Sequence, residues 1–181
     1  GLDVTVRQWG RDFTASITDG HCAWRGLDAA GAPLSLGGEV PQLPLPSVAC
    51  ALQVLAWLDV WDEDAFARQL PAMRLPGRMQ QLAALGCQWI LDVAHNAAGA
   101  GFLASRLQQA DAVPVTAVFS AMADKDLAGI FAALAPAVQQ WILFPLVDNP
   151  RAASLLQLRE AARAAGIAGQ AILTCDSLPL A

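Results

Sequence analysis

The sequence has no cluster of basic residues. Its 181 residues include 11 Lys and Arg against 16 Asp and Glu, and the formal net charge is −5. Strong binding to nucleic acid or to an anionic membrane surface requires concentrated positive charge. We therefore expect neither nucleic acid nor a membrane among the main partners.

Long hydrophobic runs are absent too. The longest apolar stretch, residues 47–61, is interrupted by Gln53 and Asp59, whereas a membrane-spanning helix needs about 20 predominantly apolar residues in a row. This stretch therefore predicts a buried helix. Because 55% of all residues are hydrophobic, we expect the chain to form one good-sized core or two small ones.

The cysteines form no recognisable motif. Cys22, Cys50, Cys87 and Cys175 are widely separated, with no C-x-x-C pair, no Cys/His ligand spacing and no preceding signal peptide. Such usage favours a reducing, cytoplasmic location, thiols in the core and no metal site. The chain also starts at Gly1 and not at Met, which we interpret as the mark of a fragment.

Short alternating segments fill residues 2–26 and predict two or three antiparallel strands. Asp19-Gly20 has the composition of a hairpin turn between two of them. Residues 28–46 are rich in Gly and Pro, which predicts a loop with at most one edge strand.

Two helices are expected next. Hydroxyl and carboxylate side chains satisfy the unpaired amide groups at a helix start, so Ser47 is the predicted N-cap of a helix over 47–58 and Asp62 of one over 63–70. A Pro-Gly pair then stops any helix and the composition changes. We therefore predict a domain boundary near residue 75.

The second half alternates regularly between strands and helices. Strands are expected at 88–93, 113–120, 140–146 and 169–174, and helices at 97–109, 126–138 and 150–165. In the second helix Leu127, Ile130, Phe131 and Leu134 share one face, and in the third Asn149, Pro150 and Gly166 carry the start and stop signals. Continuous apolar strands between helices predict an α/β fold with a Rossmann-like, mostly parallel sheet and helices on both faces.

Polar residues follow each of these strands. The four groups are Asp92, His95 and Asn96; Ser120, Asp124, Lys125 and Asp126; Asp148 and Asn149; and Thr174, Cys175 and Asp176. The carboxyl ends of parallel strands share one edge of the sheet, where open α/β folds bind their ligands. Simpler explanations exist as well: helix caps for Asp92 and Asn96, a solvated helix start for Asp124 and Asp126, a surface histidine for His95 and an interface arginine for Arg78.

Four motifs in order resemble one family. They are "LPLPSVACAL" (43–52), "LPGRMQ" (75–80), "ILDVAHNAAGAGF" (90–102) and "ADKD" (123–126). Together they resemble the bacterial folylpolyglutamate synthase/dihydrofolate synthase family of the Mur ligase superfamily. The resemblance implies that residues 1–75 end a central ATPase domain and that 76–181 form most of a C-terminal α/β domain.

The resemblance also implies a reaction. Members use ATP and Mg²⁺ to convert a carboxylate of dihydropteroate or of a folate's glutamate tail into an acyl phosphate, which the amine of L-glutamate attacks. By the family's pattern, Arg78 and Asp92 should touch the nucleotide, and His95 should lie near the glutamate or the acyl phosphate. Ser47 stands where the family has an Asn that contacts ATP, and is assigned to the nucleotide as well.

The remaining site residues are assigned from their position. Asn96, Asp124 and Asp126 are expected on the substrate side, and Lys125 is expected to pair with a glutamate carboxylate and to assist catalysis. No G-K-[ST] phosphate loop occurs in the 181 residues. The loop and the Mg²⁺ ligands should lie in an N-terminal ATPase region of the same protein, so this chain alone should be inactive.

Three other interpretations stay open. A peptidoglycan Mur ligase shares D-x-A-H-N-P but usually has G-R-x-E, so Gln80 favours the folate branch. A stand-alone binding module that has lost its chemistry is a second alternative. A dinucleotide-binding domain is disfavoured because "AHNAAGAG" lacks G-x-G-x-x-G.

Overall fold

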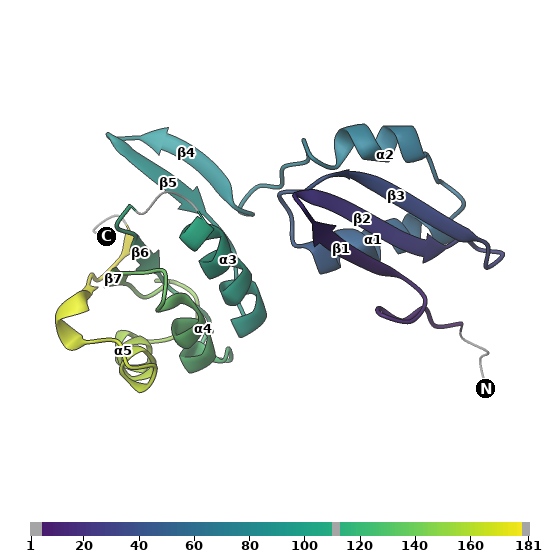
Figure 1. Cartoon of the computed structure of the whole chain (residues 1–181). Helices are drawn as coiled ribbons and strands as arrows, with labels where there is room; N and C mark the ends of the chain where they lie inside the picture. The colour runs from purple at the N-terminus through teal and green to yellow at the C-terminus, as the bar shows by residue number, and fades with distance from the viewer. Residues whose placement is uncertain (1–4, 110–112, 179–181) are drawn as a thin grey trace. The chain divides into compact units, whose positions relative to one another are not determined.

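The computed structural model describes residues 5–109 and 113–178. The chain divides into two compact units, Gly1–Leu91 and Asp92–Ala181 (Figure 1). The predicted α/β class is confirmed, because a three-stranded parallel sheet flanked by helices lies in the second unit and a small antiparallel sheet in the first. The predicted domain boundary near residue 75 stays a prediction, since the compact units divide after Leu91.

The first unit is built on an antiparallel sheet in the order β1-β2-β3, with β1 at Thr14–Thr18, β2 at His21–Leu27 and β3 at Pro33–Glu39. The predicted hairpin turn is confirmed, because Asp19 and Gly20 both have positive φ and Thr18 faces His21. The predicted edge strand is β3. Residues 5–8 form no strand, and residues 2–4 of that expectation lie outside the described part of the chain.

Two helices cover this sheet, α1 at Leu45–Trp57 and α2 at Glu63–Gln69. The predicted cap at Ser47 is wrong. Proline's fixed φ suits the first turn of a helix, so α1 starts earlier, with Pro44 at its N-cap and no side-chain cap. Asp62 caps α2 as predicted, by accepting a hydrogen bond from the Ala65 N–H at 2.8 Å.

The first core lies between α1 and the sheet. Its buried members are Phe13, Trp24, Leu36, Val48, Ala49, Leu52 and Ala56. Gln53, only 3% exposed, accepts from the Leu27 N–H at 3.1 Å and donates to the Leu27 carbonyl at 2.6 Å. The Gln53 side-chain amide thus hydrogen-bonds both the N–H and the carbonyl of Leu27, as the backbone of a neighbouring strand would. These two bonds satisfy the buried polar groups of Gln53.

Gly26 leaves no room for a side chain beside this core. A Cβ there would overlap the Trp24 ring and lie 2.5 Å from Gln53 Oε1. We expect Gly26→Ala to lower the free energy of unfolding by about 1–3 kcal/mol, the usual cost of overpacking. Urea unfolding followed by tryptophan fluorescence measures it. Gly37→Ala on β3, where a Cβ meets nothing within 4 Å, is the control, and equal loss in both variants would contradict the assignment.

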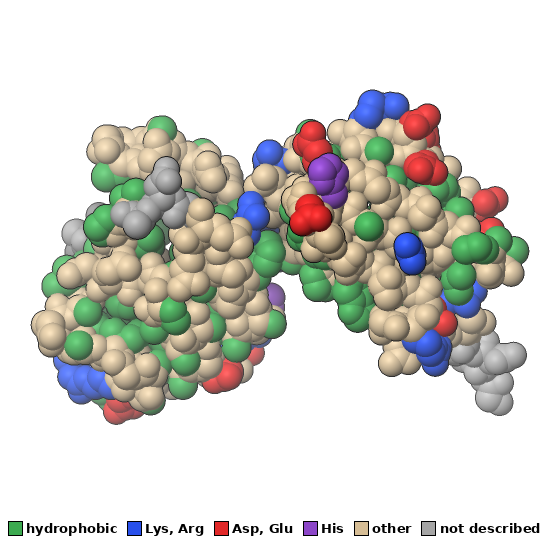
Figure 2. Space-filling model, viewed as in Figure 1, with side chains coloured by type: hydrophobic (Ala, Val, Ile, Leu, Met, Phe, Trp, Pro, Cys, Tyr) green, Lys and Arg blue, Asp and Glu red, His purple; other side chains and the backbone are tan. Residues whose placement is uncertain are grey.

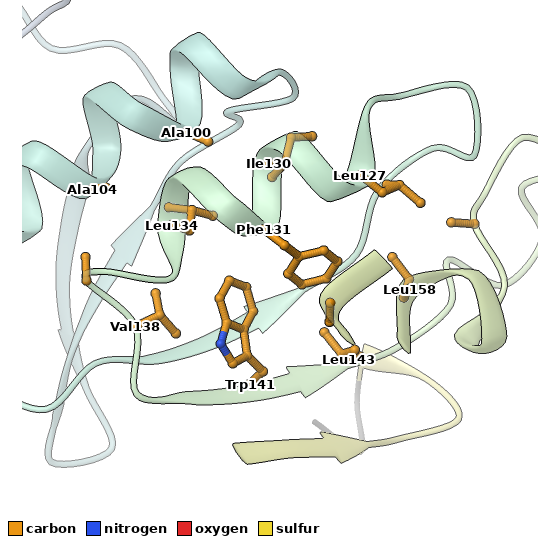
Figure 3. Close-up of a cluster of buried hydrophobic side chains, with 13 residues drawn as sticks. Ala100, Ala104, Leu127, Ile130, Phe131, Leu134, Val138, Trp141, Leu143 and Leu158 are labelled. Carbon is orange, nitrogen blue, oxygen red and sulfur yellow. The ribbon is translucent and has the colours of Figure 1, made fainter. Parts of the chain in front are cut away.

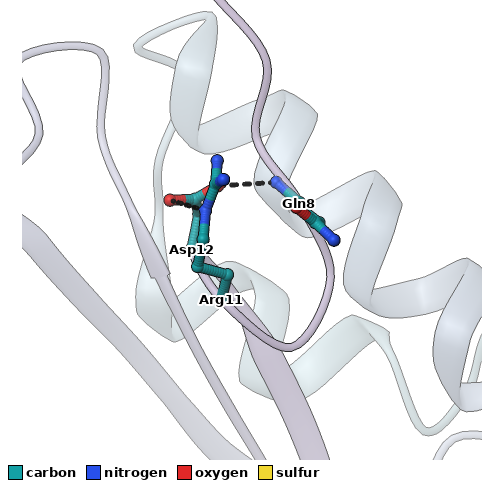
Figure 4. Close-up of polar contacts among 3 residues, drawn as sticks. All are labelled: Gln8, Arg11 and Asp12. Atoms are coloured by element: carbon teal, nitrogen blue, oxygen red, sulfur yellow. Dashed lines mark hydrogen bonds and ion pairs between the residues drawn. The ribbon is translucent and has the colours of Figure 1, made fainter.

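A polar turn precedes β1. The Asp12 carboxylate accepts from the Gln8 N–H at 2.7 Å and pairs with the Arg11 guanidinium at 2.8 Å (Figure 4). The hydrogen bond from Arg11 and the backbone bond from Gln8 hold the pKa of Asp12 below its ordinary value. The segment also carries an isolated bridge between Trp9 and Phe13, whose rings meet edge to face.

The strand predicted at 88–93 does not join the parallel sheet. It is β5, Cys87–Leu91, and it forms an antiparallel hairpin with β4, Gln80–Ala84, in a separate two-stranded sheet. The turn is Leu85-Gly86, both with positive φ. Two successive residues with positive φ are typical of Asn-Gly or Gly-Gly turns. Because Leu85 stands at the first of these positions, the sequence carried no clear signal for this hairpin.

The second unit contains α3 (Ala97–Gln109), β6 (Thr116–Phe119), α4 (Leu127–Leu134), β7 (Gln140–Leu143), α5 (Leu155–Ala164), the short 3₁₀ helix η1 (Gly169–Ala171) and β8 (Ile172–Thr174). The sheet is parallel in the order β6-β7-β8, with three strands and not the four that the sequence predicted. Helix α4 packs against both α3 and α5.

The predicted helix face of α4 is confirmed. Leu127, Ile130, Phe131 and Leu134 are all buried, and Phe131 points from α4 toward Trp141 of the sheet (Figure 3). Phe131 lies 4.9 Å, ring centre to ring centre, from both Phe119 and Trp141. This aromatic cluster joins α4 to β6 and β7 and forms the centre of the second core.

The start predicted for the last helix is wrong. Helix α5 begins only at Leu155, after Ser154, which forms a capping box with Gln157. Asn149 instead accepts from the Arg151 N–H at 3.0 Å in a local turn. The predicted end is confirmed, because Gly166 follows the helix with φ +82°.

The cysteines are all reduced, but the core position predicted for them is wrong in part, since Cys50 and Cys87 are exposed. In the part of the chain that the structure describes, no helix is long and apolar enough to cross a membrane.

On the face drawn in Figure 2, Lys and Arg side chains are scattered singly among the described residues.

Candidate functional site

The candidate site is the carboxyl edge of the parallel sheet in the second unit. Strands β6, β7 and β8 run in register, with Phe119 beside Leu143 and Leu143 beside Thr174. Each strand then leads into a polar loop on this edge, where α/β folds bind their ligands. The segments after β6 and β7 carry most of the charge.

Backbone pairing holds these two segments together. The Ala123 N–H donates to the Arg151 carbonyl at 2.8 Å, and the Ala153 N–H donates to the Ala121 carbonyl at 2.9 Å. Met122 and Ala152 form an isolated antiparallel bridge between them. The position of the Asp-Lys-Asp motif is therefore fixed by the segment that follows β7.

The same two segments share an ion cluster. Arg151 Nη2 lies 3.1 and 3.2 Å from the two Asp124 carboxylate oxygens, and Lys125 Nζ lies 3.6 Å from Asp124 Oδ2. Partial desolvation acts to raise the pKa of Asp124, but the positive charges of Arg151 and Lys125 outweigh it and hold that pKa below its ordinary value. Asp124 is therefore ionised at neutral pH.

Asp126 acts as a helix cap. Its carboxylate accepts from the Gly129 N–H at 2.9 Å, at the start of α4. A Cβ at Gly129 would overlap this carboxylate, so the glycine permits the cap. The structural explanation considered for Asp126 is confirmed, and its contact with substrate stays a prediction.

Three predicted residues lie in one turn before α3. Asn96 Oδ1 accepts from the Gly99 N–H at 2.8 Å, so Asn96 caps α3, while Asp92 Oδ1 accepts from the Ala94 N–H at 2.8 Å and shapes the turn. His95 is exposed, and its Nδ1 lies 3.3 Å from the Val93 carbonyl oxygen. Because a carbonyl only accepts, this contact is a hydrogen bond when Nδ1 carries a proton, and in the neutral ring that tautomer has its lone pair on Nε2.

Arg78 and Ser47, the other two residues expected to contact the nucleotide, lie in the first unit. Arg78 ends a tight turn, in which its N–H donates to the Leu75 carbonyl at 3.1 Å and Gly77 has φ +65°. Gln80 Oε1 accepts from the Gly77 N–H at 2.9 Å, so this side chain stabilises the L-P-G-R turn. Ser47 lies in the first turn of α1.

Arg151 is the residue that sequence reasoning missed. It was placed inside a helix predicted from Pro150 onward, where an arginine is an ordinary solvated side chain. A signal was available, because "DNPR" (148–151) lies in the segment after a predicted strand, as the other polar groups do. Among the described residues no group of three or more His, Cys, Asp or Glu could hold a metal ion.

Comparison with known proteins establishes the family. The model for the Mur ligase glutamate ligase domain matches residues 77–180, more than half of the chain. The chain therefore belongs to the Mur ligase family and carries its glutamate ligase domain.

Its relatives are folate enzymes. The dihydrofolate synthase/folylpolyglutamate synthase of Escherichia coli (strain K12) is 36% identical over 161 residues, which are 86% of this chain and 36% of that protein. The structure of E. coli FolC in complex with DHPP and ADP has a TM-score of 0.71 at 31% identity, covering 94% of this chain and 39% of the other.

A further solved structure is a bifunctional folylpolyglutamate synthase/dihydrofolate synthase with Mn, AMPPNP and L-glutamate bound. Its TM-score is 0.77 at 31% identity, over 97% of this chain and 40% of the other. The resemblance drawn from the four motifs is thus confirmed. The chain spans 36% to 40% of the length of these relatives.

Proposed function

We propose that this chain is part of an ATP-dependent amide-bond ligase that adds L-glutamate to dihydropteroate, to the glutamate tail of folates, or to both. The observation that carries the proposal is the 36% identity, over 86% of the chain, to a dihydrofolate synthase/folylpolyglutamate synthase. A relative of this type binds L-glutamate together with AMPPNP and Mn. A cytoplasmic location, where folates and ATP are available, belongs to the same proposal.

ATP supplies the phosphoryl group that activates the acceptor carboxylate. Arg78 fits a role at the nucleotide, because a guanidinium pairs well with phosphate oxygens. The Asp92 carboxylate accepts hydrogen bonds, as a partner of ribose hydroxyls must, and the Ser47 hydroxyl is placed at the start of a helix. As the resemblance implies, we assign the Mg²⁺ ligands to an N-terminal region of the protein, and we assign no step here to the metal.

His95 has the chemistry of a base for the incoming amino acid. With Nδ1–H donated to the Val93 carbonyl, the Nε2 lone pair of the neutral ring can take a proton from the glutamate ammonium. The free amine then attacks the acyl phosphate, an amide bond forms, and inorganic phosphate leaves. Lys125, Asn96, Asp124 and Asp126 are proposed to line the substrate side.

The chain is proposed to work with an N-terminal ATPase region of the same protein. Support comes from α1, which is apolar on both sides: one side covers the sheet, while Cys50, Val54 and Leu58 on the other are exposed. A pocket of about 400 Å³ lies beside this second row, and Arg7 sits 5.1 Å from the Trp57 ring there. A helix that is apolar all round is normally buried.

The test is a ligation assay on the protein encoded by the whole reading frame that contains this chain. We expect ADP release and a glutamyl product with dihydropteroate or a folate, ATP, Mg²⁺ and L-glutamate. Product formation with a UDP-muramyl peptide instead would assign a peptidoglycan ligase. Absence of ligation with both substrates would favour the non-catalytic binding module. The 181-residue chain alone is expected to be inactive.

A further inference from the structure

We propose that Gln80 is a positioning residue for nucleotide binding, because its side chain locks the turn that presents Arg78. The proposal rests on the function proposed above, in which the Arg78 guanidinium reaches the phosphates of ATP. It gives Gln80 a role in the L-P-G-R-x-Q motif that involves no contact with a substrate.

The first support is the set of hydrogen bonds in this turn. The turn is L-P-G-R (75–78), with Pro76 second and Gly77 third at φ +65°, the residue pattern of a type II turn. Its own hydrogen bond joins the Arg78 N–H to the Leu75 carbonyl at 3.1 Å and does not use the Gly77 N–H. Gln80 Oε1 accepts from that half-buried N–H at 2.9 Å. A backbone donor held away from water needs such a partner.

The second support is the backbone on either side of Arg78. Gly77 precedes it with φ +65°, and Met79 follows it with φ +48°. A non-glycine residue with positive φ costs conformational free energy and persists only where its surroundings hold it. The bond from Gly77 to the Gln80 side chain closes a ring that contains Arg78 and Met79. Without this bond the glycine could adopt other conformations, and the direction of the Arg78 side chain would no longer be fixed.

The third support is the anchoring of Gln80 itself. Gln80 is the first residue of β4, and it pairs with Leu91 at the end of β5. Its side chain therefore ties the L-P-G-R turn to the β4-β5 hairpin. Arg78 is held between two fixed points, the turn before it and the strand after it.

The bond requires an acceptor at position 80 and nothing more. The Gln80 side chain contributes only its carbonyl oxygen to it. A glutamate carboxylate offers an acceptor of the same reach, so the Gln of G-R-x-Q and the Glu of G-R-x-E can hold the turn in the same way. Gln80→Glu therefore keeps the contact, whereas Gln80→Leu removes the acceptor at similar side-chain size.

The test measures AMPPNP binding, in the presence of Mg²⁺, to the protein encoded by the whole reading frame. Gln80→Leu should weaken AMPPNP binding by about two- to tenfold, the usual effect of losing one neutral hydrogen bond. Gln80→Glu should bind within about twofold of wild type, because the hydrogen bond is kept. Gln81→Leu, the same change at the next residue of β4, which is exposed, is the control and should bind normally. Isothermal titration calorimetry gives all four affinities.

A double-mutant cycle separates positioning from a general loss of structure. If Gln80 acts through Arg78, Gln80→Leu should weaken AMPPNP binding little further in a protein that already carries Arg78→Ala, whereas independent effects would add. Normal affinity in Gln80→Leu would overturn the inference, and so would additive losses in the cycle. An equal loss in Gln81→Leu or in Gln80→Glu would overturn it as well.

AMPPNP binding does not require ligation, so the outcomes distinguish this inference from the ligase proposal. Weaker binding in Gln80→Leu of a protein that forms no glutamyl product supports the role of Gln80 and refutes the ligase. Normal binding in Gln80→Leu of an active ligase refutes the role of Gln80 and leaves the ligase standing. Absence of AMPPNP binding by the wild-type protein refutes both.

Discussion

Replacing His95 with Gln should lower the kcat/KM for glutamate addition in the complete protein by about 10²- to 10⁴-fold, the usual contribution of a general base. The reason is the contact of His95 Nδ1 with the Val93 carbonyl oxygen, which favours the tautomer with its proton on Nδ1. With Nδ1–H directed at the Val93 carbonyl, Nε2 is the nitrogen that can take the ammonium proton of glutamate. Glutamine keeps a polar group of similar reach but cannot accept that proton at neutral pH.

The chain offers a matched control for this prediction. His21 is the only other histidine, and its Nδ1 lies 3.0 Å from the Asp19 carbonyl oxygen in the same two-residue arrangement. His21→Gln should change kcat/KM by less than about twofold, since His21 is the first residue of β2 and has no assigned role. A steady-state assay with saturating ATP measures both. If the two variants lost activity equally, the loss would reflect folding, and the catalytic role of His95 would be wrong.

Replacing Phe131 with Ala should lower the free energy of unfolding of the second unit by about 3–5 kcal/mol, as large-to-small substitutions of buried aromatic residues do. Phe131 is fully buried between α4 and the sheet. The variant would lose both ring contacts, to Phe119 and to Trp141, and leave a cavity at the centre of the core. Thermal and urea unfolding, followed by circular dichroism, measure the change.

Leu156→Ala is the control, since Leu156 is an exposed apolar residue on α5 of the same unit. A surface substitution of this kind should change the free energy of unfolding by at most about 0.5 kcal/mol. A domain of ordinary stability has about 5–15 kcal/mol in total, so Phe131→Ala should populate unfolded molecules at moderate temperature. A loss in Phe131→Ala no greater than in Leu156→Ala would contradict the placement of the core.

Much of the second unit could be predicted from periodicity. The four apolar positions of α4 recur at helical spacing, and a face of this kind has to be buried wherever the helix packs. The bounds of α3 were predicted correctly for a related reason, since Asn96 offers the first turn a side-chain acceptor. Helical periodicity and capping residues depend only on residues near one another in the sequence, so they can be recognised without knowing the rest of the fold.

The errors arose where pairing between distant segments decided the outcome. Residues 87–91 are as apolar as a buried parallel strand, but the Leu85-Gly86 turn pairs them with β4. Asn149-Pro150 resembles a helix start, yet residues 151–153 pair with the loop after β6 and delay α5 to Leu155. That pairing also hid Arg151 from sequence reasoning, because its partner Asp124 is 27 residues away.

The site could be predicted only as groups of polar residues after four strands, and the placement of Asp92, His95 and Asn96 on the edge of the parallel sheet was wrong in its premise, because β5 lies outside that sheet. The resemblance supplied roles for Arg78, Asp92 and His95, and these roles stay predictions. The structure added what spacing cannot contain: the ion pair between Asp124 and Arg151, the contact of His95 Nδ1 with the Val93 carbonyl and the caps formed by Asn96 and Asp126. These contacts depend on side-chain directions that the sequence does not encode locally.

The most direct test of the central claim is a crystal structure of the complete protein with AMPPNP, a divalent cation and L-glutamate. We predict the glutamate at the carboxyl edge of β6-β7-β8, with a carboxylate on Lys125 and its amine facing His95. Glutamate bound elsewhere, with this edge of the sheet occupied only by water, would contradict the account.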